Sequence, residues 1–237
     1  MAGHSKWANI KHKKERADQK KGKLFSQLTK ELISAVKAQG SDPKTNPRLR
    51  ALLEKAKKAG LSKETIERNL KKATDPKTGQ YVEVTYELYG HGGVGILALA
   101  LTDNKNRTAS SMRIATQKRG GAIASPGSVS YNFQQKGTLY VPKDSVEEDA
   151  LFLLATDLGA EDFLVEEEGY LLLVPAESLY SLKEALDEEG ISSEPSLEFL
   201  PKTTVKCGKE EQEANEALID FLDADEDIHR IYHNMAL

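Results

Sequence analysis

The sequence predicts an α+β protein of several domains, in which an N-terminal three-helix bundle precedes two ferredoxin-like α/β domains. Hydrophobic residues recur with a helical period up to residue 74, and β-rich segments alternate with helical ones from residue 81 onward. The charge also changes sign between these two parts of the chain. With 237 residues, 39% of them hydrophobic, the chain has enough apolar material for several cores.

The formal net charge of −4 hides a strong division of charge along the chain. Residues 1–78 hold 21 Lys/Arg and 8 Asp/Glu, a net charge of +13. Residues 79–237 hold 12 Lys/Arg and 29 Asp/Glu, a net charge of −17. This asymmetry is typical of a protein in which one part meets nucleic acid and another part does not.

The first part of the chain predicts three short helices. A helix from Leu24 to Lys37 carries apolar residues mostly four apart, and a second helix follows Asn46 as its N-cap and Pro47 in its first position. Ser62 caps a third helix, and residues 74–79 end it as a linker. Helices of this length are marginal alone, so we expect the three to pack on one another.

Residues 79–133 predict three strands and one helix. The segment 81–88 alternates polar and apolar residues, and 95–102 is a nearly continuous apolar run typical of a central strand. Residues 104–119 predict a helix, and VSYNF at 129–133 predicts the third strand.

The glycine-rich segment GHGGVG, residues 90–95, lies between the first two of these strands. It fits the letters of a dinucleotide-binding fingerprint, but that fingerprint follows a strand and opens a helix, whereas this segment leads into a strand. We therefore interpret it as a turn in which Gly92 and Gly93 supply the positive φ that reverses the chain.

Residues 134–204 predict a complete ferredoxin-like domain with the order β-α-β-β-α-β. The predicted elements are a strand at 137–142, a helix at 145–158, a hairpin of 162–168 with 170–175, a helix at 178–189 and a strand at 196–201. Residues 81–133 supply one helix fewer than this domain has. We therefore expect the C-terminal segment, with a helix near 210–222, to return and complete the α/β layer that residues 81–133 begin. The predicted domains are therefore 1–78, 79–133 with 205–237, and 134–204; the alternative is a separate C-terminal appendage.

The N-terminal arm is the strongest candidate for a binding surface. From Gly3 to Lys23 it carries eight cations and two acids, and Trp7, the only tryptophan, lies among them. A solvated, disordered tail is the alternative. An indole has no evident role in such a tail, whereas it can stack on a base or anchor the arm on the helices. The cationic bias continues along the predicted helices through Arg48, Arg50, Lys55, Lys57, Lys58, Arg68, Lys71 and Lys72.

The excess of lysine over arginine in this part favours contact with phosphate over the reading of base edges. No helix-turn-helix, zinc-finger or RNP signature is legible in the sequence. We therefore expect binding to the backbone or to the shape of a nucleic acid, with a strong salt dependence.

The sequence predicts no enzyme, no cofactor and no small-molecule substrate. It contains no nucleophile elbow, no Walker loop and no cysteine–histidine pairing. His229 and His233 are four residues apart and would share a metal only on a helix with a third ligand, so we expect no metal site. Residues 134–204 carry 4 Lys/Arg and 17 Asp/Glu, which indicates either a solubilising surface or a face that docks a basic protein.

Cysteine content and hydropathy predict a cytoplasmic protein. The single cysteine, Cys207, cannot form an internal disulfide, which fits a reducing compartment. No apolar run approaches the roughly 18 residues of a membrane span, and the N-terminus has no apolar signal core. We expect no membrane partner.

Four segments resemble the YebC/PmpR family, which includes the mitochondrial translational activator of cytochrome c oxidase. They are MAGHSKWANIKHKK, GSDPKTNPRLRALLEKAKKAGLSKETIERNLKK, YELYGHGGVGILALALTDNKNRT and GSVSYNFQQKG. The resemblance covers nearly the whole chain and implies a helical bundle followed by two α/β domains, the middle one completed by the C-terminus. The chain departs from the family at His91, where we expect proline, so the resemblance leaves the geometry of this turn open.

The resemblance implies a non-enzymatic regulator of gene expression that binds nucleic acid. Bacterial members are usually described as DNA-binding transcriptional regulators, whereas organellar members and some bacterial ones are tied to the ribosome and to translation. The first hypothesis is therefore a regulator on promoter DNA, and the alternative is a translation factor whose basic head enters ribosomal RNA. The residues that match the motifs of the family are Gly3, His4, Ser5, Lys6, Trp7, Lys11, Asn46, Pro47, Arg48, Asn104, Asn106, Arg107 and Thr108.

Charge and resemblance together select the candidate nucleic-acid-binding residues. These are Lys6, Trp7, Lys11, Lys13, Lys14, Arg16, Lys20, Lys21, Lys23, Arg48, Arg50 and Arg107.

Overall fold

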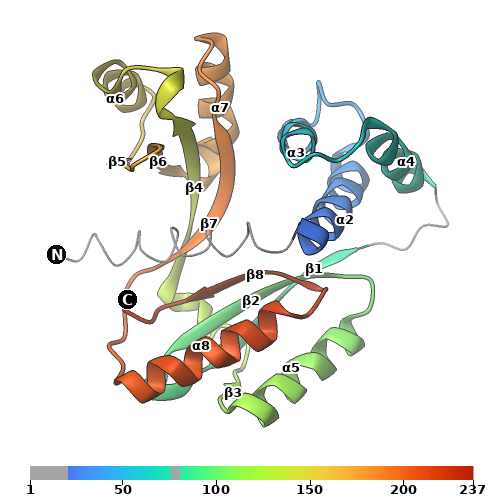
Figure 1. Ribbon diagram of the computed structural model, residues 1–237, viewed down its shortest axis with the longest axis vertical. Coiled ribbons are helices and arrows are strands. Elements are labelled where there is room, and N and C mark those ends of the chain that lie inside the picture. The colour runs from blue at the N-terminus through green and yellow to red at the C-terminus, as the bar shows by residue number, and fades with distance from the viewer. Residues whose placement is uncertain (1–20, 76–80, 237) are drawn as a thin grey trace. The chain divides into compact units, whose positions relative to one another are not determined.

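The computed structural model describes residues 21–75 and 81–236 (Figure 1). Their contacts divide them into two units: unit 1 runs to Gln134 and resumes at Pro201, and unit 2 is Gln135–Leu200. The described residues form seven α-helices and two four-stranded antiparallel sheets, so the predicted α+β class is confirmed. None of these helices has both the length and the apolar composition of a membrane span.

Unit 1 begins with three helices that pack together, as the sequence predicts (Figure 1). They are α2 (Lys21–Gln39), α3 (Pro47–Lys58) and α4 (Lys63–Thr74). Their shared core contains Leu28, Leu32, Ile33, Val36, Leu49, Leu52, Ala56, Ile66 and Ala73.

The N-caps of α3 and α4 are the predicted ones. The Asn46 side chain accepts a hydrogen bond from the N–H of Leu49 at 2.9 Å, and Ser62 accepts one from a backbone N–H at 3.2 Å. Asn46 is fully buried, and its amide nitrogen also donates to the carbonyl oxygens of Ala35 and Gly40, both at 2.9 Å. One side chain therefore fixes both the end of α2 and the start of α3.

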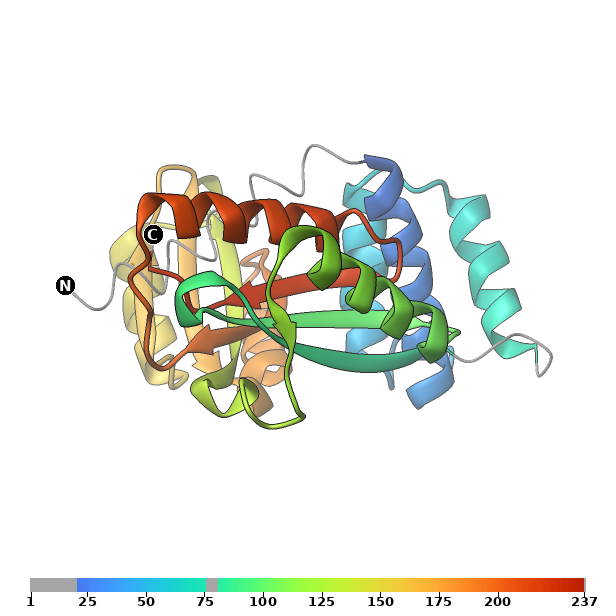
Figure 2. The same cartoon turned by 90° about the horizontal axis from the view of Figure 1, so that it is seen from below.

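The sheet of unit 1 has the strand order β3-β1-β2-β8. Its strands are β1 (Val82–Tyr89), β2 (Gly95–Thr102), β3 (Ala122–Ile123) and β8 (Ile228–His233). The helices α5 (Lys105–Arg119) and α8 (Lys209–Asp223) cover one face of it (Figure 2). Because β8 pairs with β2 and α8 packs beside α5, the C-terminal segment completes this layer, as predicted.

The turn between β1 and β2 confirms the interpretation of GHGGVG. It contains a 3₁₀ turn at His91–Gly93, and Gly92 and Gly93 have φ angles of 65° and 81°. The N–H of His91 donates to Oδ1 of Asn215 at 2.7 Å, and Nδ2 of Asn215 donates to the carbonyl of His91 at 3.0 Å. A proline at this position has no N–H, so the histidine gives the turn a hydrogen bond to α8 that the expected proline lacks.

The strand predicted for VSYNF at 129–133 is wrong in all but its last residue. Residues Ser130–Asn132 form a 3₁₀ turn, and the next strand, β4, begins at Phe133 and continues to Pro142. The third strand of the unit 1 sheet is instead the short β3.

The reason for this difference is the carboxylate of Glu87 on β1. It accepts hydrogen bonds from the N–H groups of Gly127 at 2.6 Å, Val129 at 2.6 Å and Ser130 at 2.8 Å. These donors serve a side chain, so they are not available for a strand ladder.

Unit 2 has the predicted order β-α-β-β-α-β and the strand order β5-β6-β4-β7, which is the ferredoxin-like arrangement. Besides β4, its elements are α6 (Glu148–Asp157), β5 (Asp162–Val165), β6 (Gly169–Pro175), α7 (Leu179–Glu188) and β7 (Glu194–Pro201), with 3₁₀ turns at Lys143–Ser145 and Ala176–Ser178. The order in unit 1 is β-β-α-β-α-β, so the two α/β layers share their composition and differ in connectivity.

Candidate nucleic-acid interface

Most of the predicted binding residues belong to the N-terminal arm, and those within residues 1–20 lie outside the described residues. These are Lys6, Trp7, Lys11, Lys13, Lys14, Arg16 and Lys20, and the side chain of Lys21 is outside them as well. The other four, Lys23, Arg48, Arg50 and Arg107, are described, and they belong to different sets of contacts.

Lys23 belongs to a row of polar side chains on α2 that bind the segment between α8 and β8. Its ammonium group contacts Oδ1 of Asp223 at 2.9 Å and donates to the carbonyl of the same residue. The next two members of the row follow at intervals of one helical turn: Gln27 donates to the carbonyl of Ile228 at 3.1 Å, and Lys30 donates to the carbonyl of Glu226 at 2.8 Å. The row therefore attaches α2 to the sheet layer of unit 1.

Its contacts make Lys23 a weaker candidate than the sequence alone indicates. The Lys23 side chain is 15% exposed, and its charge is already compensated by Asp223. A phosphate group would have to compete with that carboxylate at a side chain that is mostly buried.

Asp227 lies at the centre of a second set of contacts, which includes Arg107. Its carboxylate accepts hydrogen bonds from Nη2 of Arg107 at 2.6 Å and from the hydroxyls of Thr102 and Thr108 at 3.0 Å. Nζ of Lys30, on α2, binds the other carboxylate oxygen at 3.0 Å. Burial by itself raises the pKa of Asp227, but the hydrogen bonds from Arg107, Lys30 and Thr108 outweigh it, so the pKa lies below its usual value.

The motif residues Asn104, Arg107 and Thr108 therefore have structural roles. Asn104 caps α5 by accepting from the N–H of Arg107 at 3.1 Å, and Thr108 is fully buried against Asp227. Arg107 is 53% exposed and also pairs with Asp103 at 2.9 Å. Its role in nucleic-acid binding remains a prediction, and its role in holding Asp227 is a feature of the structure.

Arg48 and Arg50 do not face the same side of α3, because residues two apart on a helix point in different directions. Arg48 pairs with Glu83 of β1 at 2.6 Å, and both side chains are well exposed. Arg50 is half-buried and has a polar or electrostatic interaction of its own.

Further exposed cations of the helical part lie on α3 and α4. Arg68, Lys71 and Lys72 are exposed, pair with no other described residue, and lie three and four positions apart on the side of α4 opposite Ile66 and Ala73. We call these three residues the α4 triad. Lys55 and Lys57 of α3 are exposed in the same way.

Helix stability explains part of this pattern. Lysines in the last turn interact favourably with the helix dipole, and Lys55, Lys57, Lys71 and Lys72 all occupy last turns. Arg68, in the middle of α4, has no such explanation. The α4 triad is absent from the residues selected by sequence, although a helical projection that places Ile66, Asn69 and Ala73 inward would have found it.

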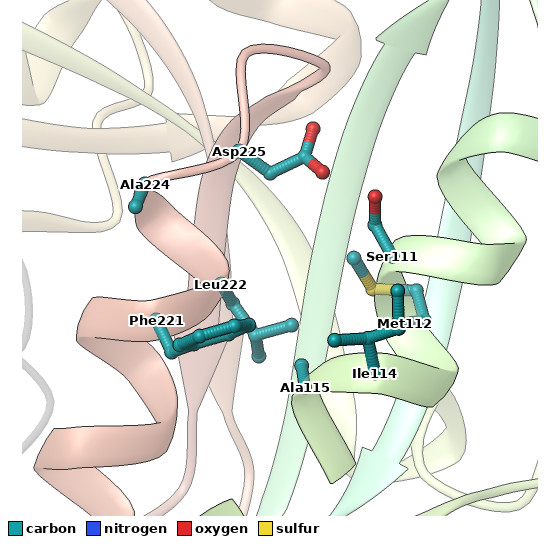
Figure 3. A pocket seen from close by; sticks show the side chains of 8 residues that line it. All are labelled: Ser111, Met112, Ile114, Ala115, Phe221, Leu222, Ala224 and Asp225. Carbon is teal, nitrogen blue, oxygen red and sulfur yellow. The ribbon is translucent and has the colours of Figure 1, made fainter. Parts of the chain in front are cut away.

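A shallow pocket of about 260 Å³ lies between α5 and α8. Figure 3 shows the α5 side chains Ser111, Met112, Ile114 and Ala115 facing Phe221, Leu222, Ala224 and Asp225. Lys118 and Arg119 each lie 5.6 Å from the centre of the Phe221 ring. The polar side chains in the lining are one hydroxyl and one carboxylate, so the lining does not combine a nucleophile with a histidine base.

His229 and His233 lie on a strand, β8, and not on a helix. A separation of four residues along a strand corresponds to about 13 Å, which is too far for one metal ion. No group of three or more metal-ligating side chains occurs within residues 21–75 and 81–236.

Two sequence models of one family match the chain. The model described as the TACO1/YebC protein N-terminal domain matches residues 5–76, and the one described as the TACO1/YebC second and third domain matches residues 81–235. Together they span the helical part and both α/β layers.

Curated relatives match the full length of this chain, and a solved structure matches most of it. A probable transcriptional regulatory protein of Chlamydia pneumoniae is 56% identical over 238 residues, covering 100% of both chains. One of Protochlamydia amoebophila is 52% identical and covers 100% of this chain and 97% of its own. The crystal structure of a conserved hypothetical protein from Aquifex aeolicus has a TM-score of 0.83 and 38% identity, covering 92% of this chain and 91% of its own.

Proposed function

Because the chain belongs to the TACO1/YebC family, we propose that it is a regulator of gene expression that binds nucleic acid through its N-terminal helical part. Relatives at 52% and 56% identity are named probable transcriptional regulatory proteins, so duplex DNA is the ligand that we propose first. The proposal includes no catalytic step and no cofactor. It assigns nucleic-acid binding to residues 1–78, the first of the three domains that the sequence predicts.

The α4 triad is the observation that carries this proposal. Residues 21–75 have 14 Lys/Arg and 6 Asp/Glu, a net charge of +8. Many of these cations are engaged, whereas Arg68, Lys71 and Lys72 present three charges together to solvent. Flexible lysines bind phosphate oxygens as point charges, so such a surface holds a nucleic-acid backbone without reading its sequence.

The arm extends this surface in the proposal. It contributes Lys6, Lys11, Lys13 and Lys14, with Trp7 to stack on a base or to anchor the arm. Reversal of these four lysines to glutamate is expected to abolish binding at physiological salt while the thermal unfolding transition stays unchanged. Unchanged affinity would remove the arm from the interface.

The contribution of the α4 triad is tested by the salt dependence of binding. The variant Arg68→Gln, Lys71→Gln, Lys72→Gln is titrated with a fluorescent duplex DNA at several salt concentrations. Each phosphate contact contributes about 0.9 to the slope of log K against log salt, so the slope should become shallower by about two to three.

The matched control removes three exposed lysines elsewhere, as Lys143→Gln, Lys206→Gln, Lys209→Gln. It has the same net charge as the triad variant but should keep the slope of the natural chain. Equal slopes for the two variants would show that net charge, and not the triad, governs binding.

Structured RNA is the second candidate ligand. The α4 triad offers charge without a set of side chains that reads base edges, and such binding also suits an RNA whose shape supplies the specificity. Sedimentation of the native protein in a gentle lysate, with DNase and high-salt controls, separates the two ligands. Comigration with ribosomes that survives DNase and is lost in salt supports a translation factor, whereas a DNase-sensitive heavy fraction supports the DNA regulator.

A further inference from the structure

The charge of unit 2 makes nucleic acid an unsuitable ligand for its surface. Residues 135–200 hold 3 lysines, no arginine and 17 Asp/Glu, a net charge of −14. Two of the lysines are already paired, Lys136 with Glu161 at 2.5 Å and Lys183 with Asp187 at 2.8 Å. A ligand of this unit must therefore be neutral or cationic.

Exposed apolar side chains of this acidic unit occur on α6 and β5, and the half-buried ring of Phe163 contacts one of them. Phe152 and Leu153 of α6 are 51% and 65% exposed, and Val165 of β5 is 45% exposed. The ring of Phe163 meets the ring of Phe152 edge-on, with 5.4 Å between their centres. Val165 follows Phe163 by two residues on the same strand, so both point to the same face of the sheet. We call Phe152, Leu153, Phe163 and Val165 the α6 patch.

The place of the patch in the fold explains why it is not covered by unit 2 itself. The strand β5 is an edge strand of its sheet, so no further strand of unit 2 lies beyond Val165. Leu151 and Ala155 already turn the inner side of α6 into the core, which leaves Leu153 on the outer side.

Acidic residues border the patch along the helix. Asp149, Leu153 and Asp157 follow one another at intervals of four, so a leucine lies between two exposed carboxylates on one side of α6. Glu148 lies one turn before Phe152 in the same way. A charged surface alone keeps a protein soluble, but it does not explain adjoining exposed Phe and Leu side chains at its centre.

We propose that the α6 patch is the docking site for a basic protein segment. The segment places an aliphatic or aromatic side chain against Leu153 and Phe152, and its lysines or arginines meet Asp149 and Asp157. The apolar centre supplies affinity, and the acidic border supplies orientation and association rate. Unit 2 of a second copy is a poor occupant, because it would bring another net charge of −14 against the first.

The test uses the full chain and two synthetic peptides of defined composition. The first is a fluorescent peptide of lysines and leucines, and the second has serine in place of each leucine. The Lys/Leu peptide should bind more tightly than the Lys/Ser peptide. The variant Leu153→Ser should bind the Lys/Leu peptide with about tenfold lower affinity and the Lys/Ser peptide with unchanged affinity. The reason is that only the first peptide has apolar side chains to bury.

Two controls separate the patch from the rest of the molecule. The variant Ile114→Ser removes an exposed apolar side chain from unit 1 and should leave both peptides unaffected. The variant Asp149→Asn, Asp157→Asn should lower the affinity for both peptides and reduce the salt dependence of binding. Both effects should be larger than in the variant Glu210→Gln, Glu213→Gln on α8, which changes the net charge by the same amount.

Three results would overturn the proposal. The first is equal affinity for the two peptides, which would show simple charge attraction. The second is that the Leu153→Ser variant binds the Lys/Leu peptide as tightly as the natural chain does. The third is a concentration-dependent dimer, seen by sedimentation, that Leu153→Ser abolishes, because the patch would then bind a second copy. None of these results bears on nucleic-acid binding by the helical part.

Discussion

Asp227 shows how a single residue connects distant parts of the chain. Its carboxylate is almost completely buried, and it is shared by Lys30 of α2 and by Arg107 and Thr108 of α5. Because ionised partners compensate it, removing one of them leaves a buried charge without its counterpart, which is more costly than losing an exposed pair. The arginine and the threonine of the motif DNKNRT therefore both bind an aspartate that lies 120 and 119 residues away from them, respectively.

His229 is a half-buried histidine whose protonation opposes folding. Burial lowers its pKa from 6.5 to about 4, and the effects of the nearby Glu31 and Glu83 on the one side and Arg230 and Arg48 on the other are smaller. The unfolded chain takes up this proton near pH 6.5, whereas the folded chain does not until about pH 4. The folded state therefore loses stability as the pH falls between these values, by about 3 kcal/mol at most.

The variant His229→Gln should show a flatter dependence of unfolding free energy on pH in this range. The measurement is chemical denaturation at several pH values between 7 and about 4.5, with comparison of slopes rather than of absolute stabilities. Parallel curves for the variant and the natural chain would contradict the assignment to His229.

Local signals in the sequence predict some residue roles and miss others. The caps Asn46 and Ser62 and the turn glycines Gly92 and Gly93 are legible because each acts on its own neighbours. The roles of Glu87 and Asp227 cannot be predicted from local sequence, because their hydrogen-bond partners are tens of residues away or more. In the sequence they look like ordinary surface acids. The α4 triad lies between these cases, since the sequence predicts the helix, and the outward side follows only once Ile66, Asn69 and Ala73 are placed inward.

The loop from Gly127 to Ser130 depends on one carboxylate of a neighbouring strand. Burial by itself raises the pKa of Glu87, but the hydrogen bonds from Gly127, Ser130 and Val129 lower it below its usual value. The carboxylate thus accepts several donors at once, which an amide side chain cannot do equally well.

We expect Glu87→Gln to lower the free energy of unfolding by about 2 kcal/mol and to speed hydrogen exchange at the amides of Gly127, Val129 and Ser130. The matched control is Glu83→Gln on the same strand, whose exposed pair with Arg48 should be worth less than about 1 kcal/mol. Unchanged exchange at these amides would show that the loop is held by other contacts.

The same loop explains why the elements were predicted unevenly. The strand β1 alternates polar and apolar residues and β2 is a nearly continuous apolar run, and the order of the elements indicates that the C-terminus returns to the sheet. The strand β3 has two residues and no periodicity to detect, whereas VSYNF has the composition of a strand but donates its first two N–H groups to the side chain of Glu87. Composition predicts a strand only where a neighbouring strand is free to pair.

At the scale of the whole molecule, the chain leaves unit 1 after Gln134 and re-enters it at Pro201, and the unit 1 residues beside these two points are hydrogen-bonded to each other. The N–H of Lys202 donates to the carbonyl of Asn132 at 2.7 Å, and the N–H of Thr203 donates to its side chain at 3.1 Å. Unit 2 is therefore an insertion whose two ends meet within unit 1.

Excision of residues 135–200, with a short Gly/Ser link from Gln134 to Pro201, should leave unit 1 with cooperative thermal unfolding. It changes the net charge from −4 to +10, because the excised segment carries −14. If the helical part binds DNA as proposed, affinity at low salt should rise by about tenfold, and the gain should shrink as screening increases. Loss of cooperative unfolding would contradict the insertion view, and unchanged affinity in a folded variant would show that unit 2 exerts no repulsion.

The pairing of β2 with β8 has a consequence for how the chain is made. Residues 95–102 leave the ribosome long before residues 228–233. The apolar β2 therefore remains without its β8 partner while more than a hundred further residues are synthesised. Unit 2 has all its strands and helices within that interval and is free to fold first. A transcript that stops shortly before residue 228 would thus release a chain with one finished domain and one sheet with an open edge, which is a natural substrate for chaperones and proteases.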